Sequence, residues 1–463
     1  MPKNFSGSIQ QLKSLAAASG DVRLQRAVAE IGDLIQVGNI TNASGVAIGH
    51  DIRMVVNHLN VSPETVAALL ALRNQASMAL GVDPNKYRFD VEEKTEGFVG
   101  RQHVFKAIED FLTDSPGGYL MITADPGMGK TTLLAEYVRR NHCIAHFNVR
   151  GQGIVEISKF LESICAQLIV DFGLPHTSLP PDALQDGRFL QQLLKEASKK
   201  LESGERLVIA IDALDEVAPG SQASCTNILC LPTDLPKNVY VILTRRPVDI
   251  PFLAAYSEFN LMNFSTENRA DVVMYLQHKS QREIIQKWIQ AQGMKQDEFV
   301  ERLTILSESN FMYLHHILPE IENGQYHDRD MGELPRGLMG YYRDHWRHMG
   351  MESKPLPREK ILVVYILSEA AKPVSCKRIS DALRFNGIDI DEIAVQSILN
   401  EWDQFLHKHR EGGMKRYSIY HASFQDFLHQ QDVVQMAGLT IKDVNQLLAE
   451  ELLDGWRRII KNE

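Results

Sequence analysis

The stretch Ile122–Leu134, ITADPGMGKTTLL, decides the fold of this chain. An apolar run leads into it, Gly127 and Gly129 punctuate it, and an apolar helical pattern follows Lys130. Glycines let backbone N–H groups come close to phosphate oxygens, and the start of the following helix adds the positive end of its dipole. The stretch matches the spacing G-x-x-x-x-G-K-[ST], with Ala124 in place of the first glycine. It predicts a phosphate-binding loop in which the lysine reaches the terminal phosphates.

An apolar strand that ends in an acidic residue follows downstream, as a phosphate-binding loop of this kind requires. Leu207–Asp212, LVIAID, is an apolar run that ends in an acid. A carboxylate at the end of a buried strand beside such a loop is the expected magnesium ligand, together with the Thr131 hydroxyl. Asp215 and Glu216 follow within four residues of this acid. Either one could orient or activate a water molecule, and either one alone could instead be a solvated turn acid.

A further apolar strand is predicted at Val239–Leu243, and it is followed by Thr-Arg-Arg-Pro. An arginine fixed at the end of a strand near a phosphate site can sense the terminal phosphate, because its guanidinium loses a bidentate partner when that phosphate leaves. We predict that Arg246 is this sensor and that Arg245 is structural.

The amino-acid composition limits the classes of protein to which this chain can belong. The 463 residues suggest three or four domains, and 44% hydrophobic residues indicate a folded chain. The net charge of -10 gives no general attraction to DNA or to an anionic membrane. The five cysteines are odd in number and form no C-x-x-C, which argues against a disulfide framework and a zinc site. No signal peptide or apolar stretch of about 20 residues stands out, so we expect a cytoplasmic protein.

The segment before Pro84 differs in composition from the rest. Ser8–Ser19 and Asp21–Val37 have apolar residues at helical spacing, which predicts two amphipathic helices. Between them and a third predicted helix, Gly38–Val61 alternates short β-prone triplets with turn residues. This pattern is typical of a β-hairpin, and it also fits a stackable β-arch that would template self-assembly or recruit an effector.

The second half of the chain is mainly helical. Ser265–Lys295 and Phe299–Leu306 predict a lid-like helical bundle. After Pro357 the pattern predicts three helices and a ribbon strand, the order of a winged helix: Ile361–Glu369, Cys376–Leu383, Asp391–His407 and Lys415–Tyr420. The helix in the recognition position is acidic and carries no lysine or arginine before Lys408. Phosphates would repel it, so we expect a packing and switching module that does not read DNA.

Taken together, the chain from Gly97 to about Leu448 resembles the NACHT-type STAND ATPases, signalling P-loop proteins related to AAA+ proteins. The motifs that carry the resemblance are FVGR (98–101), ADPGMGKTTL (124–133), LVIAIDALDE (207–216), LTRRP (243–247), NFMYLHHILPEI (310–321), LPRGLMGYYRDHW (334–346) and YHASFQDFL (420–428). The resemblance implies a multidomain α/β protein with an AAA+-like parallel sheet. The implied domains are a small, mainly helical N-terminal domain (1–84), a linker (85–96), the nucleotide-binding domain (97–262), a helical lid domain (263–350), a winged-helix domain (351–430) and a C-terminal helical segment (431–463).

The resemblance also implies roles for single residues. Val99 and Arg101 would contact the base region, and His421 would come from the winged helix to hold ADP in a closed state. Asp215 or Glu216 would serve hydrolysis, and Arg246 would sense the γ-phosphate. The implied phosphate contacts are Pro126, Gly127, Met128, Gly129, Lys130, Thr131 and Thr132, and the implied Mg²⁺ ligands are Thr131 and Asp212. One family feature differs: the G-x-P proline that often touches the adenine is replaced at Ser309–Phe311, which weakens the case for base contact from that side.

The function implied by the resemblance is an ATP/ADP switch, closed with ADP and open to form homo-oligomers with ATP. Hydrolysis would be slow and regulatory, and many bacterial members of the family act in antiviral, innate-immune-type defence. An effector or sensor protein would bind through residues 1–84 or the C-terminal end. Two other classes stay open: a binding scaffold stabilised by nucleotide, and a winged-helix transcription regulator.

Overall fold

The computed structural model describes Ala17 and residues 83–446, except residues 88, 177, 218–224, 226, 325–330, 371, 412 and 439. The predictions for the N-terminal helices and for Gly38–Val61 lie outside the described residues, as does the C-terminal segment from residue 447. The described residues group into two compact units. The first contains residues 83–124, 130–148 and 154–263, and the second contains residues 125–129, 149–153 and 264–446.

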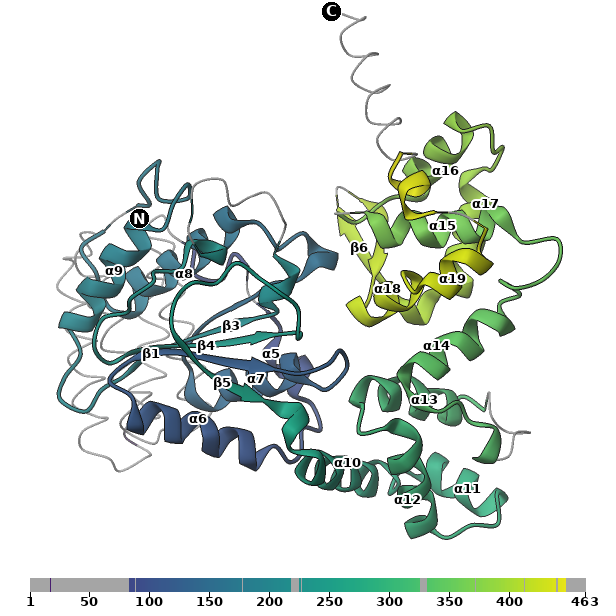
Figure 1. The fold of residues 1–463 in the computed structure, drawn as a ribbon, viewed down its shortest axis with the longest axis horizontal. Helices are drawn as coiled ribbons and strands as arrows, with labels where there is room; N and C mark the ends of the chain where they lie inside the picture. Colours follow the sequence, from purple (N-terminus) through teal and green to yellow (C-terminus); the bar gives the residue numbers. More distant parts are fainter. Residues whose placement is uncertain are drawn as a thin grey trace, which may run out of the picture. The chain divides into compact units, whose positions relative to one another are not determined.

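A parallel sheet forms the centre of the first unit (Figure 1). Its strands lie in the order β2-β3-β4-β1-β5, and every neighbouring pair is parallel. The strands are β1 (Gly118–Thr123), β2 (Ile144–Phe147), β3 (Leu207–Asp212), β4 (Val239–Arg245) and β5 (Tyr256–Asn260). The four strands other than β5 are nearly continuous apolar runs, as expected for strands that are buried on both faces.

Helices cover both faces of this sheet. Alternate strand residues such as Tyr119 and Val241 join one apolar cluster with α8 and α9, whereas Tyr240 packs edge-on against Phe111 of α6. Figure 1 shows α6 on the opposite side of the sheet from α8 and α9. The helices of this unit are α5 (Val91–Thr95), α6 (Gln102–Asp114), α7 (Lys130–Asn141), α8 (Ile157–Asp171) and α9 (Arg188–Lys199).

The strand order decides which side chains can meet. Strand β4 lies between β1 and β3, with Thr244 beside Ile122 and Leu243 beside Ile211. Because the strands are parallel, their carboxyl ends share one edge of the sheet. The end of β4 therefore lies between the start of the phosphate loop and the acid that ends β3.

In its described residues, the second unit is helical apart from one antiparallel ribbon. Its ribbon pairs β6 with β7 from Leu406 opposite Ile419 to Glu411 opposite Met414, and Val374 bridges to Tyr417. The elements are α10 (Ser265–Lys279), α11 (Glu283–Ala291), α12 (Gln296–Ser307), α13 (Phe311–Glu322), α14 (Gly337–His348), α15 (Arg358–Glu369), α16 (Cys376–Phe385), α17 (Glu392–Glu401), β6 (Leu406–Glu411), β7 (Met414–Ile419), α18 (Ala422–Leu428) and α19 (Gln431–Met436).

The helix predicted at Asp391–His407 is too long at its carboxyl end. Helix α17 stops at Glu401, a single 3-10 turn follows, and β6 begins at Leu406. The reason is tertiary, because Phe405 is buried in an aromatic cluster and the next residues pair with β7. A helix continued through this segment could not form that ribbon.

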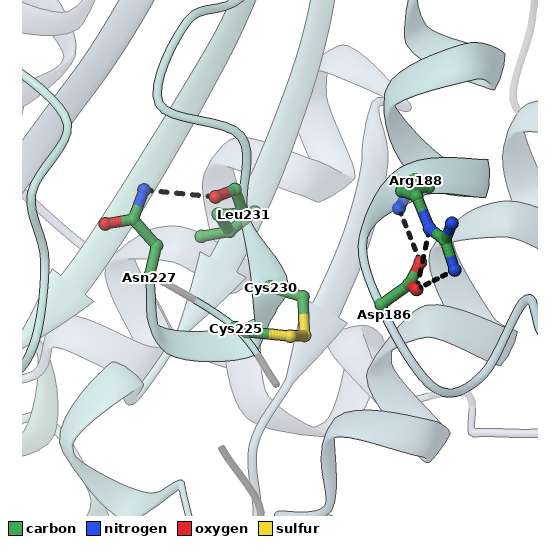
Figure 2. The surroundings of a disulfide bond; sticks show 6 residues. All are labelled: Asp186, Arg188, Cys225, Asn227, Cys230 and Leu231. Carbon is green, nitrogen blue, oxygen red and sulfur yellow. Dashed lines mark hydrogen bonds and ion pairs between the residues drawn. A yellow bond between two sulfur atoms is a disulfide. The ribbon is translucent and has the colours of Figure 1, made fainter. Parts of the chain in front are cut away.

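The expectation about the cysteines is corrected for one pair. The structure joins Cys225 and Cys230 in a disulfide, with their Cα atoms 5.1 Å apart (Figure 2). Between them, the Asn227 side-chain amide donates a hydrogen bond to the Leu231 carbonyl at 3.0 Å, which holds the turn. An odd cysteine count rules out complete pairing but not a single bond, and the spacing alone does not reveal a turn that brings two cysteines together.

Candidate functional site

The backbone of the phosphate-binding loop adopts a conformation that its glycines make possible. Gly127 and Gly129 have φ values of +81° and +82°, in the left-handed region that favours glycine. The Lys130 Nζ atom donates to the carbonyl of Ala124 at 2.7 Å, which places the lysine across the loop. Helix α7 begins at this lysine, so its first N–H groups lie at the end of the loop.

The structure brings together Thr131 and Asp212, the two residues that the sequence analysis gives as magnesium ligands. The Thr131 hydroxyl donates to Asp212 Oδ2 at 2.7 Å, across 81 residues of chain. Burial of the Asp212 carboxyl raises its pKa above the ordinary value, and the hydrogen bonds from Thr244 and Thr131 oppose this rise. A hydroxyl beside a carboxylate is the kind of oxygen donor set that Mg²⁺ takes, so these residues fit the ion.

Two residues that were given no role in the sequence analysis hold Asp212 in place. Thr244, which is fully buried, hydrogen-bonds to Asp212 Oδ1 and accepts the backbone N–H of Ala213 at 2.9 Å. The Asn148 side chain donates to the Asp212 carbonyl at 2.7 Å. Thr244 could have been found from its position at the end of the fourth strand, once the strand order was known.

Asp215 and Arg246 form an ion pair. The Arg246 Nε atom is 2.5 Å from Asp215 Oδ2, and the Arg246 backbone N–H donates to Oδ1 at 2.9 Å. The Asp215 side chain is only 3% exposed. Glu216 lies in the same 3-10 turn, Leu214–Glu216, and is half-buried. Arg245 points elsewhere, because its Nη1 atom donates to the carbonyl of Val248 at 2.7 Å.

The segment before α6 is ordered around Arg101. This residue is 2% exposed and has a left-handed φ of 62°, and its carbonyl accepts the N–H groups of Val104 and Phe105. Val99 is half-buried two residues earlier. The Arg140 guanidinium lies over the ring of Phe98 at 5.8 Å and over the ring of Phe105 at 4.5 Å, which ties this segment and α6 to α7.

His421 belongs to the second unit. It caps α18, with Nδ1 accepting the Ser423 N–H at 3.2 Å and lying 2.6 Å from the Ser423 hydroxyl. That hydroxyl is in turn 2.8 Å from the hydroxyl of Tyr342. The structure thus brings Lys130, Thr131, Asp212, Asp215 and Arg246 to one edge of the first unit, and it places His421 in a separate hydrogen-bond chain of the second unit.

The fold and this site define a P-loop NTPase, with the phosphate loop directly after β1 and the acid Asp212 at the end of β3. Residues 97–242 match the family model described as an AAA ATPase domain. The chain therefore carries a nucleotide-binding P-loop domain of the AAA type. None of the curated proteins that were compared matches the chain. No helix in the described part of the chain is long and apolar enough to cross a membrane.

One solved structure with overall similarity is that of Drosophila ORC bound to DNA. The similarity covers 75% of this chain and 97% of the Drosophila chain, at 14% sequence identity and a TM-score of 0.32. This similarity is too low to carry an argument about fold or function.

Proposed function

We propose that this protein is an ATP/ADP-gated signalling switch of the NACHT-type STAND class that hydrolyses ATP slowly. The observation that carries the proposal is the edge of the sheet where Lys130, Thr131 and Asp212 lie beside the Asp215–Arg246 ion pair. Bound Mg²⁺ would neutralise charge on the phosphates there. Asp215 and Glu216 supply the carboxylates that hydrolysis needs, and Lys130 supplies a cation for the terminal phosphates.

The ion pair supports a switch over a simple binding site. Arg246 is held by Asp215, and its side chain is 21% exposed. Its guanidinium can exchange this carboxylate for a γ-phosphate, since both offer paired oxygens in a fork geometry. Such an exchange would free one of the hydrolytic acids only when ATP is present. ATP then shifts the population of states if it binds the open state more tightly than the closed one.

The domain division of the proposal follows the motifs. It consists of an adaptor domain (1–84), a linker (85–96), a NACHT domain (97–262), a helical lid domain (263–350), a winged-helix domain (351–430) and a C-terminal helical segment (431–463). The change of unit between Asn263 and Phe264 supports the boundary between the NACHT domain and the helical lid domain. The order α15, α16, α17, β6, β7, with the bridge from Val374 to Tyr417, supports the winged helix.

In the proposed cycle, His421 holds ADP in the closed state, and ATP opens the chain to form a homo-oligomer in a bacterial defence pathway. Val99 and Arg101 would lie by the base. An effector or sensor would bind residues 1–84 or the C-terminal end. Helix α17 begins with Asp391 as its cap and ends at Glu401, and this acidic character supports a module that does not bind DNA.

The test uses Lys130→Ala in the full chain. We expect the purified wild-type protein to release ADP or ATP when it is denatured, to hydrolyse ATP slowly and to gain mass with ATP. Lys130→Ala should contain no bound nucleotide and should not assemble with ATP. Its affinity for nucleotide should fall at least about 100-fold, because the charge-assisted contacts of Lys130 with the terminal phosphates are lost. Lys106→Ala is the matched control, since Lys106 lies on α6 and pairs only with its helix neighbour Asp110 among the contacts of the described residues.

Retained ATP-dependent assembly in Lys130→Ala would overturn the switch. Nucleotide that is bound but never hydrolysed by the wild-type chain would favour the scaffold, in which nucleotide only stabilises the fold. Salt-sensitive DNA binding would favour the transcription regulator.

A further inference from the structure

The first turn of α13 contacts the phosphate loop directly, within the second unit. Asn310 is the N-cap of α13, and its Oδ1 atom accepts the N–H groups of Met312 at 3.0 Å and Tyr313 at 3.2 Å. The Nδ2 atom of the same side-chain amide donates to the carbonyl of Pro126 at 2.9 Å, across 184 residues of chain. One side chain thus caps a helix and holds the loop.

The helix backbone holds the next carbonyl of the loop. The Gly127 carbonyl accepts the N–H groups of Phe311 at 3.0 Å and Met312 at 3.2 Å. In a trans peptide the C=O and N–H bonds point in opposite directions. Holding the carbonyls of Pro126 and Gly127 on α13 therefore turns the N–H groups of Gly127 and Met128 away from α13. The Gly127 N–H is of the kind that a phosphate loop uses to bind oxygen atoms, and the Met128 N–H donates to the carbonyl of Asp125 within the loop at 3.4 Å.

The fit between loop and helix leaves no room for a side chain. A Cβ atom on Gly127 would lie 2.3 Å from Asn310 Oδ1. The approach to α13 is also constrained, because Glu308 and Ser309 have φ values of 52° and 62° in the left-handed region. Residues persist there when surrounding contacts hold them, and the ion pair of Glu308 with Arg336 at 3.0 Å is one such contact.

We propose that Asn310 is a positioning residue for the nucleotide phosphates: it sets the orientation of the loop N–H groups from α13. The inference rests on the proposed function, since it concerns the same loop. It gives a role to the segment where the family proline is replaced, and this role concerns the phosphates and not the base. By reciprocity, bound phosphate strengthens the contact between the loop and α13, so α13 reports whether the loop is occupied.

The test separates positioning from helix capping. Asn310→Ala loses both functions, whereas Asn310→Ser keeps a good N-cap but is too short to reach the Pro126 carbonyl. We expect both variants to bind Mg·ATP and Mg·ADP roughly tenfold more weakly, the loss of about 1.4 kcal/mol. Asn310→Ser should keep a near wild-type Tm. Asn323→Ala removes an exposed asparagine at the other end of the same helix and should change neither quantity.

Binding is measured by titration calorimetry on the full chain, and Tm by thermal unfolding without nucleotide. Asn310→Ser with wild-type affinity would overturn the inference, because it would show that capping is the whole role of Asn310. If Asn310→Ala does not fold, Asn310→Ser still carries the test. A wild-type chain that binds no ATP would instead overturn the proposed function, and the inference with it.

Discussion

The sheet edge of the first unit and the aromatic cluster around His316 in the second unit bury polar groups in different ways. At the sheet edge of the first unit, each buried carboxylate has matched partners: Asp212 is held by two threonines and Asp215 by Arg246. In the second unit, His316 is buried, and its ring stacks on Tyr341 with centroids 4.9 Å apart. Its Nε2 atom has no hydrogen-bond partner within the described residues.

The difference lies in the hydrogen-bond partners that each environment supplies. Burial raises the pKa of Asp212, and the hydrogen bonds from Thr244 and Thr131 oppose this rise. Burial among aromatic rings instead lowers the pKa of His316 to about 3, with smaller effects from His315, His421 and His345. The sheet edge thus gives its buried carboxylates polar partners, whereas the aromatic cluster keeps the His316 imidazole neutral.

The largest effect is expected from Arg246→Ala, which breaks the ion pair of the first unit. It leaves the buried Asp215 carboxylate without its cation and should cost about 3 kcal/mol of unfolding free energy. Denaturant unfolding measures this loss, and hydrogen exchange of the backbone amides in β3 and β4 shows whether it is local to these strands. Arg245→Ala, one residue earlier on the same strand end, is the control and should cost much less. Equal losses in the two variants would show that Asp215 does not depend on its partner.

Thr244→Val should have a smaller effect of about 2 kcal/mol, because it leaves the Ala213 N–H and one oxygen of Asp212 without their hydrogen bonds. It should also raise the Mg²⁺ concentration needed for ATP binding, since the carboxylate is no longer held. Thr244→Ser keeps the hydroxyl and should restore the Mg²⁺ dependence. A normal Mg²⁺ dependence in Thr244→Val would mean that Thr131 alone positions Asp212.

The smallest effect, when it is counted per pH unit, concerns the second unit. An unfolded histidine takes up a proton near pH 6.5, whereas folded His316 does so only near pH 3. Between these values the unfolded chain binds more protons, so this residue makes stability fall as pH falls, by about 1.4 kcal/mol per pH unit. His316→Phe should lower the slope of stability against pH by that amount between pH 6 and 4. His348→Phe, at a site on α14 whose side chain is 49% exposed, is the control substitution.

Much of the sheet followed from local pattern, and the prediction of a parallel sheet is confirmed. Strand β3 has the predicted bounds because it is an apolar run that ends in an acid. Strand β5 was not predicted, because Tyr256–Asn260 is a largely exposed edge strand without an apolar run. It is defined by its pairing with β1, which no local pattern records.

The sequence by itself indicated the phosphate loop, Thr131 and Asp212 as candidate ligands, and the set of acids that follows β3, because glycine spacing and an apolar strand are local signals. The tertiary structure alone decided that Thr244 holds Asp212, that Arg246 pairs with Asp215 and that Asn310 holds the loop. Strand order and helix docking bring these residues together across long stretches of chain. Such contacts depend on the fold as a whole, and no fixed spacing in the sequence reveals them.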